Sequence, residues 1–114
     1  MIVDLDVREE IIVEYADARF LFQPLTSSEI NLILQKHTRF KRGTERLNKA
    51  AAGRELFMRQ LVRWENLKDR DGNEIPCTDE AKHKLWETKP LICNEILARF
   101  DEAQEAQEEA CTKN

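Results

Sequence analysis

The sequence contains few residues that break or cross-link a chain, with three glycines, three prolines and three cysteines among 114 residues. It has no run of about 18 apolar residues, so it offers no candidate membrane span. The first seven residues carry acidic side chains where a secretory leader would need a basic stretch and an apolar run. We therefore expect a protein of the cytoplasm with no membrane partner.

The cysteines are odd in number and include no C-x-x-C pair. Cys77, Cys93 and Cys111 therefore suit free thiols in a reducing compartment better than a disulfide framework. A zinc site would have to combine the first two with His37 and His83, and their separations match no usual zinc spacing. We predict no bound metal.

Signatures of catalysis are also missing, since the chain has no phosphate-binding loop and no dinucleotide fingerprint. Cys77 near His83 is the one candidate nucleophile pair, and nothing identifies a group that would orient the histidine. Asp69 and Asp71 faintly resemble the start of a calcium loop, but Gly72 falls at the fourth loop position instead of the sixth. We predict a non-enzymatic protein without a cofactor.

The chain does contain 41% apolar and 35% charged residues, which fits one small domain with a modest core. The charge is unevenly distributed beneath a net charge of −4. Residues 36–70 hold eleven basic side chains against four acidic ones, whereas both ends of the chain are acidic. Such polarity can steer a partner or let copies associate end to middle, as a homo-oligomer that high salt would weaken.

Strand patterns dominate the N-terminal part. Residues 2–7 alternate apolar and acidic side chains, and residues 11–15 and 19–23 are rich in β-branched and aromatic residues. Residues 16–18 would connect the second and third of these runs. We predict an α+β fold, mostly helical, in which an N-terminal β-hairpin, or three short strands, packs on about four helices.

The helical patterns begin after Pro24. Thr26 and Glu29 match a capping box, which predicts a helix over residues 27–37, and residues 38–44 read as a basic loop. Apolar side chains at steps of three and four predict a long second helix from Thr44 to Trp64, in which Gly53 marks a close crossing. Two further helices are predicted at residues 78–88, and from Pro90 onward.

The same pattern sets the domain boundaries. Ile96 and Phe100 lie on the apolar face of the last helix, and beyond Phe100 that face decays to alanines among acidic residues. We predict a single domain over residues 1–100 and an acidic, partly frayed helical tail over residues 101–114.

Residues 64–78 form the stretch around which the chain is arranged. Asp71 and Gly72 suit a tight reversal, so the side chains before the turn (Trp64, Leu67) can fold onto Ile75 after it. We call this stretch the clasp, and its pattern alone leaves open whether it is a hairpin or an irregular loop.

The clasp, reading W-E-N-L-K-D-R-D-G-N-E-I-P-C-T, and the entry R-F-L-F-Q-P-L-T-S-S-E at residues 19–29 resemble segments of the tail assembly chaperones of phages and prophages. The resemblance covers about two-thirds of the chain. It implies a host-cytoplasmic protein, absent from the mature virion, that holds the tape-measure protein and in some cases recruits tail-tube protein. Four side chains would form the partner-binding patch, each of which could equally belong to the core: Trp64, Leu67, Ile75 and Trp86.

A second reading comes from another functional class. The basic segment with Phe40 interleaved could serve a small regulatory nucleic-acid-binding protein, although the acidic overall balance and the lack of a recognition-helix pattern make nucleic acid the less favoured partner. Its basic patch would be Lys36, Arg39, Lys41, Arg42 and Arg46.

Overall fold

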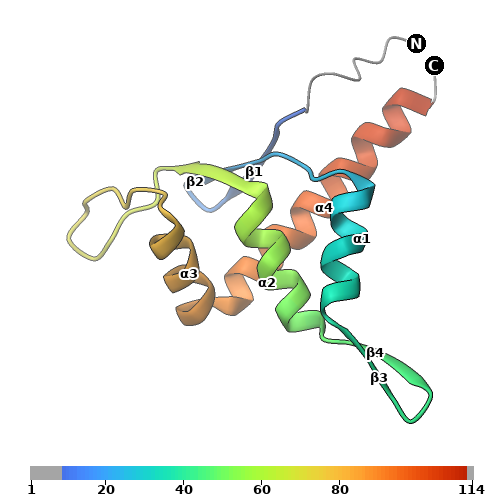
Figure 1. Cartoon of the computed structure of the whole chain (residues 1–114). Coiled ribbons are helices and arrows are strands. Elements are labelled where there is room, and N and C mark those ends of the chain that lie inside the picture. The colour runs from blue at the N-terminus through green and yellow to red at the C-terminus, as the bar shows by residue number, and fades with distance from the viewer. Residues whose placement is uncertain (1–8, 113–114) are drawn as a thin grey trace.

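The computed structural model describes residues 9–112, which form five strands and four helices (Figure 1). In chain order these are β1 (Ile11–Tyr15), β2 (Ala18–Phe22), α1 (Ser27–Lys36), β3 (Thr38–Lys41), β4 (Thr44–Leu47), α2 (Lys49–Gln60), β5 (Leu61–Glu65), α3 (Asp79–Thr88) and α4 (Pro90–Thr112). The predicted α+β, mostly helical fold is confirmed. The strand predicted over residues 2–7 lies outside the described residues.

The main sheet has three antiparallel strands in the order β1-β2-β5. The predicted hairpin over residues 11–23 is therefore present, but a two-residue turn at Ala16 and Asp17 joins its strands and Ala18 already belongs to β2. Ala16 has a φ of 53°, in the region that tight hairpin turns require. The third strand comes from the middle of the chain, where the sequence pattern had predicted a helix.

The predicted helix from Thr44 to Trp64 is wrong at both ends. α2 begins at Lys49, after the Asn48 side chain caps its first turn, and it ends at Gln60. The cause of the misreading is a β-bulge in β5, where the register against β2 shifts by one residue. The extra residue lets Leu61 and Trp64 face the core together although they are three apart, which imitates helical spacing.

The predicted basic loop at residues 38–44 is also wrong, because these residues form a second sheet, the hairpin β3–β4. Its turn consists of Arg42 and Gly43, which both have positive φ angles of 54° and 75°. Two residues of this conformation match the twist of the flanking strands. We call residues 38–47 the basic arm, and Figure 1 shows it projecting from the body at the lower right.

The helix boundaries follow their predicted caps. Thr26 and Glu29 form the capping box of α1. The Thr78 hydroxyl accepts from the backbone N–H of Ala81 and starts α3. Pro90 is the first residue of α4, where its missing N–H costs no helical hydrogen bond.

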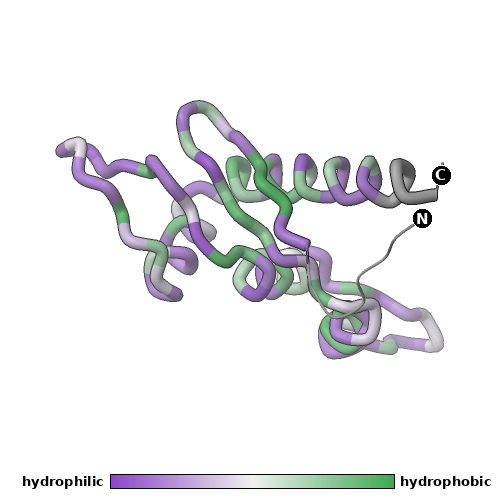
Figure 2. Tube along the Cα trace, turned by 90° about the horizontal axis from the view of Figure 1, so that it is seen from above, coloured by the Kyte–Doolittle hydropathy of each residue, from purple (hydrophilic) through white to green (hydrophobic). Residues whose placement is uncertain are grey.

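One face of the main sheet packs on α2 and α4. Phe22 is fully buried at the centre, stacked on Phe100 at 4.6 Å between ring centroids and edge-on to Phe57 at 6.3 Å. Seen from above, hydrophobic stretches run through the central strands, whereas the clasp and the basic arm at the edges are mainly hydrophilic (Figure 2). The core cluster contains Ile11, Val13, Ala18, Phe20, Phe22, Phe57, Leu61, Trp64, Cys93, Ile96 and Phe100.

The helix predicted to continue beyond Phe100 does so, through Thr112. Ala103 still packs against the core cluster, while Asp101, Glu102 and Glu105 are exposed. The change from packed helix to solvated helix is thus gradual along α4 and occurs a turn later than the apolar pattern indicates.

Candidate protein-binding site

The clasp is closed by hydrogen bonds between its two arms. The indole Nε1 of Trp64 donates to the carbonyl oxygen of Ile75 at 2.6 Å, and the Ile75 N–H donates to the Leu67 carbonyl at 2.8 Å. Lys68 and Glu74 form an antiparallel bridge beside them. The clasp is therefore a short hairpin, which settles the alternative that its sequence left open.

A single carboxylate organises the turn of the clasp. Asp69 Oδ1 accepts from the backbone N–H groups of Asp71 at 2.9 Å and Asn73 at 3.0 Å. Gly72 donates to the Asp69 carbonyl and has a φ of 83°, as the Asp-Gly pair predicted. Because this carboxylate oxygen already serves the backbone of the turn, the loop is explained without a calcium ion.

The base of the clasp is fixed to the main sheet. Asn66, with a φ of 61°, donates through its side-chain amide to the Asp17 carbonyl at 2.8 Å, and its backbone N–H donates to the Glu74 carboxylate at 3.0 Å. The clasp therefore has a defined position relative to the β1–β2 turn, 49 residues earlier in the chain.

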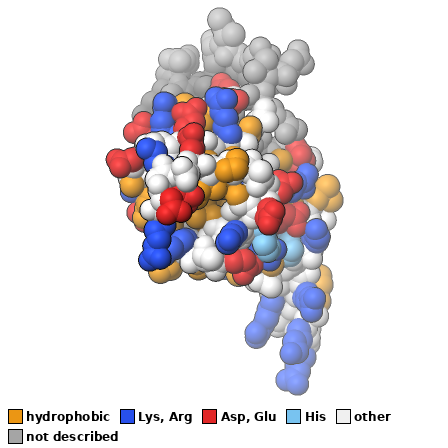
Figure 3. Space-filling view, turned by 90° about the vertical axis from the view of Figure 1, so that its left-hand side faces the viewer, with side chains coloured by type: hydrophobic (Ala, Val, Ile, Leu, Met, Phe, Trp, Pro, Cys, Tyr) orange, Lys and Arg blue, Asp and Glu red, His pale blue; other side chains and the backbone are white. Residues whose placement is uncertain are grey.

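Two apolar clefts adjoin the clasp, and Leu67, Ile75 and Leu85 line both of them. The larger, of about 410 Å³, continues toward the β1–β2 turn and the first turn of α4. The smaller, of about 350 Å³, runs along α3. Figure 3 shows exposed apolar side chains near the centre of this side of the molecule, with acidic and basic side chains around them. Mostly apolar lining with a few polar groups is typical of a binding pocket.

The structure separates the four predicted partner-binding residues. Leu67 and Ile75 are half-buried and line both clefts, and Trp64 lines the smaller cleft with only 6% of its surface exposed. Trp86 lines neither cleft, because its ring packs between α2 and α3, with its centroid 5.4 Å from that of Phe57. Trp64 is thus mainly a core residue that borders the site, and Trp86 belongs to a helix–helix contact.

Leu85 is the residue that the sequence reasoning missed. Ala81 and Leu85 lie four residues apart on α3, and both line the smaller cleft. Because residues at this spacing share one helical face, the apolar pair is the pattern by which the sequence could have indicated Leu85. Lys82 fixes α3 in place, because its buried ammonium donates to the Leu61 carbonyl at 2.6 Å where α2 passes into β5.

Cys77 and His83 do not form a nucleophile pair. The Cys77 thiol points to the Val62 carbonyl, with 3.9 Å between sulfur and oxygen, and burial raises its pKa, the reverse of what an attacking thiolate needs. His83 Nδ1 instead hydrogen-bonds Arg54 at 2.8 Å, and the ring nitrogen Nε2 lies 3.9 Å from Glu87. Among residues 9–112, no three histidine, cysteine or acidic side chains are placed to hold a metal ion.

The basic patch is brought together except for Lys36. Arg39, Lys41, Arg42 and Arg46 lie on the basic arm, and none of them has an ion-pair partner among the described residues. Lys36 lies at the end of α1, where it pairs with Glu55 at 3.1 Å.

No family model matches this chain, and no match to it emerges from the curated proteins or the solved structures. Within the described part of the chain, no helix has the length and apolar character needed to cross a membrane.

Proposed function

We propose that this protein is a non-enzymatic tail assembly chaperone of a phage or prophage, which binds the tape-measure protein during tail morphogenesis. One observation carries the proposal: the stretch on which the resemblance rests folds into a closed clasp flanked by two apolar clefts. Nothing in the clasp performs chemistry. Its side chains keep the hairpin closed and leave the apolar lining of the two clefts partly exposed to solvent.

The clefts suit an amphipathic helix from the partner. Such a helix offers apolar side chains at steps of three and four, and two adjoining clefts that share Leu67, Ile75 and Leu85 can receive two successive anchors. The rims carry charges of both signs, with Lys68, Lys89 and Asp17 on one cleft and Lys84 and Asp69 on the other. Complementary charges beside the anchors would set the orientation of the partner helix.

In this role the protein works in the host cytoplasm and leaves before the virion matures. A tape-measure protein is long, helical and apolar, so its apolar surface must be shielded from water until tail-tube subunits assemble around it. The chaperone shields this surface through weak contacts that many copies make along the partner. It can also contact the tail-tube protein.

The test is co-expression of the chain with helical fragments of the tape-measure protein encoded beside it. We expect the wild-type chain to keep a fragment soluble and to co-purify with it. Leu67→Glu, which puts a charge into both clefts, should reduce recovery of the fragment about tenfold or more, as loss of a buried apolar anchor does at interfaces.

Leu91→Glu is the matched control, because Leu91 is 82% exposed on α4 and lines neither cleft. It makes the same chemical change and should bind as the wild type does. Circular dichroism must show that both variants fold; if Leu67→Glu does not, the milder Leu67→Ser replaces it. Equal recovery with the wild-type chain and the folded cleft variant would refute the proposed site, and insoluble fragments in every case would refute the role.

A further inference from the structure

The basic arm has two different faces. In the register of β3 and β4, Arg39 lies directly opposite Arg46 and Lys41 opposite Thr44, and alternation along each strand puts all four on one face. Phe40, Glu45 and Thr38 lie on the other face, beside α1. The cations are therefore concentrated on the side of the arm that points away from the helix.

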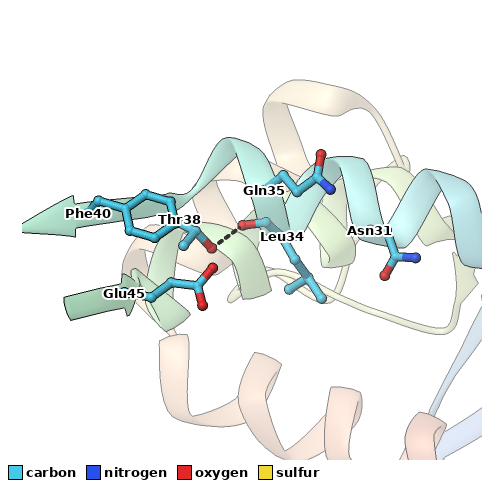
Figure 4. A pocket seen from close by; sticks show the side chains of 6 residues that line it. All are labelled: Asn31, Leu34, Gln35, Thr38, Phe40 and Glu45. Atoms are coloured by element: carbon cyan, nitrogen blue, oxygen red, sulfur yellow. Dashed lines mark hydrogen bonds between the residues drawn. The ribbon is translucent and has the colours of Figure 1, made fainter. Parts of the chain in front are cut away.

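The arm is firmly held at its base. The Thr38 hydroxyl donates to the Leu34 carbonyl at 2.6 Å (Figure 4). The Asn48 N–H donates to the His37 carbonyl at 2.9 Å. Figure 4 also shows the Phe40 and Glu45 side chains near Thr38, at the end of the pocket that adjoins α1. The cationic face is thus presented by a defined hairpin on a fixed base.

Two like charges opposite each other on paired strands repel. Arg39 and Arg46 are such a pair, and no acidic side chain of the described residues lies within ion-pair distance of either. Lys41, Arg42, Thr44 and Arg46 line a shallow cleft of about 300 Å³ on this face. An anionic group seated there would relieve the repulsion.

α4 carries a surface of the opposite charge, on which acidic side chains repel one another. Asp101 and Glu105 are four residues apart on one helical face, where like charges repel, and Glu102 lies beside them. All three are exposed and without an ion pair among the described residues. Partial desolvation by neighbouring protein atoms raises the pKa of the Asp101 carboxyl, and the charge of Glu105 raises it further.

The basic arm and the C-terminal half of α4 extend from different parts of the molecule. In Figure 1 the arm projects at the lower right, whereas the C-terminal half of α4 runs to the upper right. The spacings are also compatible, because opposed side chains on a hairpin have Cβ atoms about 5 Å apart and i,i+4 pairs on a helix about 6 Å apart. An arm from another copy can meet the carboxylates that its own arm does not reach.

We propose that the cationic face of the basic arm binds the acidic face of α4, at Asp101, Glu102 and Glu105, of a second copy of this chain. The contact joins different surfaces of two identical molecules, so it produces either a reciprocal dimer or a longer head-to-tail chain. The proposal concerns the chain by itself and does not depend on the proposed chaperone role.

Sedimentation velocity over a concentration series tests the proposal with the purified chain. We expect the mean mass to rise with concentration at low salt and to fall when salt is added, because the screening length shrinks from about 10 Å at about 0.1 M to about 3 Å at about 1 M. Arg39→Glu/Arg46→Glu and, separately, Glu102→Lys/Glu105→Lys should each weaken association about tenfold or more.

Mixing the two double variants gives the sharpest result. The arm variant keeps an intact acidic face and the helix variant keeps an intact arm, so the mixture should form a one-to-one complex at concentrations where each variant alone is a monomer. A chain that carries both pairs of substitutions has the Arg39/Arg46 charges exchanged with the Glu102/Glu105 charges, and it should recover part of the association. Arg63→Glu/Arg70→Glu, which makes the same charge change at two exposed positions that line neither cleft, should leave association unchanged.

Three results would overturn the proposal. The first is a wild-type chain that stays monomeric at all concentrations at low salt. The second is a mixture of the two variants that forms no complex while both remain folded by circular dichroism. The third is tight, arm-dependent binding of duplex DNA by a chain that does not self-associate, since a two-stranded ribbon also fits the major groove.

Discussion

Gly53 lies where the Trp86 ring of α3 packs against α2. It lies inside α2, and an added Cβ would be 3.7 Å from Cη2 of Trp86, an ordinary van der Waals distance. Trp86 does pass over Gly53, but the crossing leaves room for a methyl group, so the close approach that the sequence predicted is not one that requires glycine. We predict that Gly53→Ala raises the free energy of unfolding by about 1 kcal/mol, because alanine favours the helix over glycine.

Chemical denaturation checks this value, with Gly72→Ala as the control. Gly72 also has open space around it, but its φ of 83° is strained for any residue with a Cβ. That variant should lose about 1 kcal/mol. A destabilised Gly53→Ala would contradict the room for a methyl group beside the Trp86 ring.

At the scale of elements, Glu55 joins α1 to α2. Its carboxylate lies 2.9 Å from His37 Nε2 and 3.1 Å from Lys36 Nζ, and a second oxygen lies 3.8 Å from Arg59. The His37 hydrogen bond, followed by the Lys36 bond, lowers the pKa of Glu55 from its ordinary 4.5. The resulting stabilisation is complete above that value and is lost as the pH falls through the lower, folded-state pKa.

We therefore predict that Glu55→Gln makes the free energy of unfolding depend less on pH in the acid range. Above pH 4.5 the variant should be less stable than the wild type by about 1 kcal/mol or less, because the pairs are partly exposed, and the difference should shrink at lower pH. Urea unfolding across the acid range measures it. Glu95→Gln is the control, since Glu95 pairs with Arg99 within α4; an equal change of this pH dependence in the control variant would contradict the cross-linking role.

The elements also show what the sequence could and could not predict. The helix caps at Thr26 and Thr78 agree with the prediction, because a cap depends only on residues that are close by in the sequence. The strand β5 was missed because its identity depends on β2, a distant partner, and on a bulge that spaces Leu61 and Trp64 like helical residues. Local pattern carries no information about a pairing partner, so tertiary context overrode it.

The basic arm and the binding site were each predicted in part for similar reasons. Arg42-Gly43 indicates a two-residue hairpin turn less strongly than Asn-Gly does, so the sequence pattern predicts a loop where the arm forms. In the site, Leu67 and Ile75 were found because they flank a readable turn. Leu85 was missed and Trp86 misplaced, because neighbours on a helix point about 100° apart and only the packing of α3 shows which one faces the clasp.

At the scale of the whole molecule, α4 closes the core over the sheet, and Cys93 reports on that closure. The thiol is fully buried beside Ile96 and Phe100, and burial raises its pKa to about 11. Thiol reagents attack the thiolate, so Cys93 is protected both by its burial and by its protonation. Exposure requires α4 to leave the sheet, which also breaks the stacking of Phe22 on Phe100.

We predict that a chain with Cys93 as its sole thiol reacts with a thiol reagent at a rate set by global unfolding. Increasing urea should accelerate the reaction with the dependence found for equilibrium unfolding, because both expose the same surface. A chain with Cys77 as its sole thiol is the comparison, and this half-buried thiol should react faster at every urea concentration. A Cys93 rate that urea leaves unchanged would show that α4 opens by itself, and the sheet and helices would then not unfold as one cooperative unit.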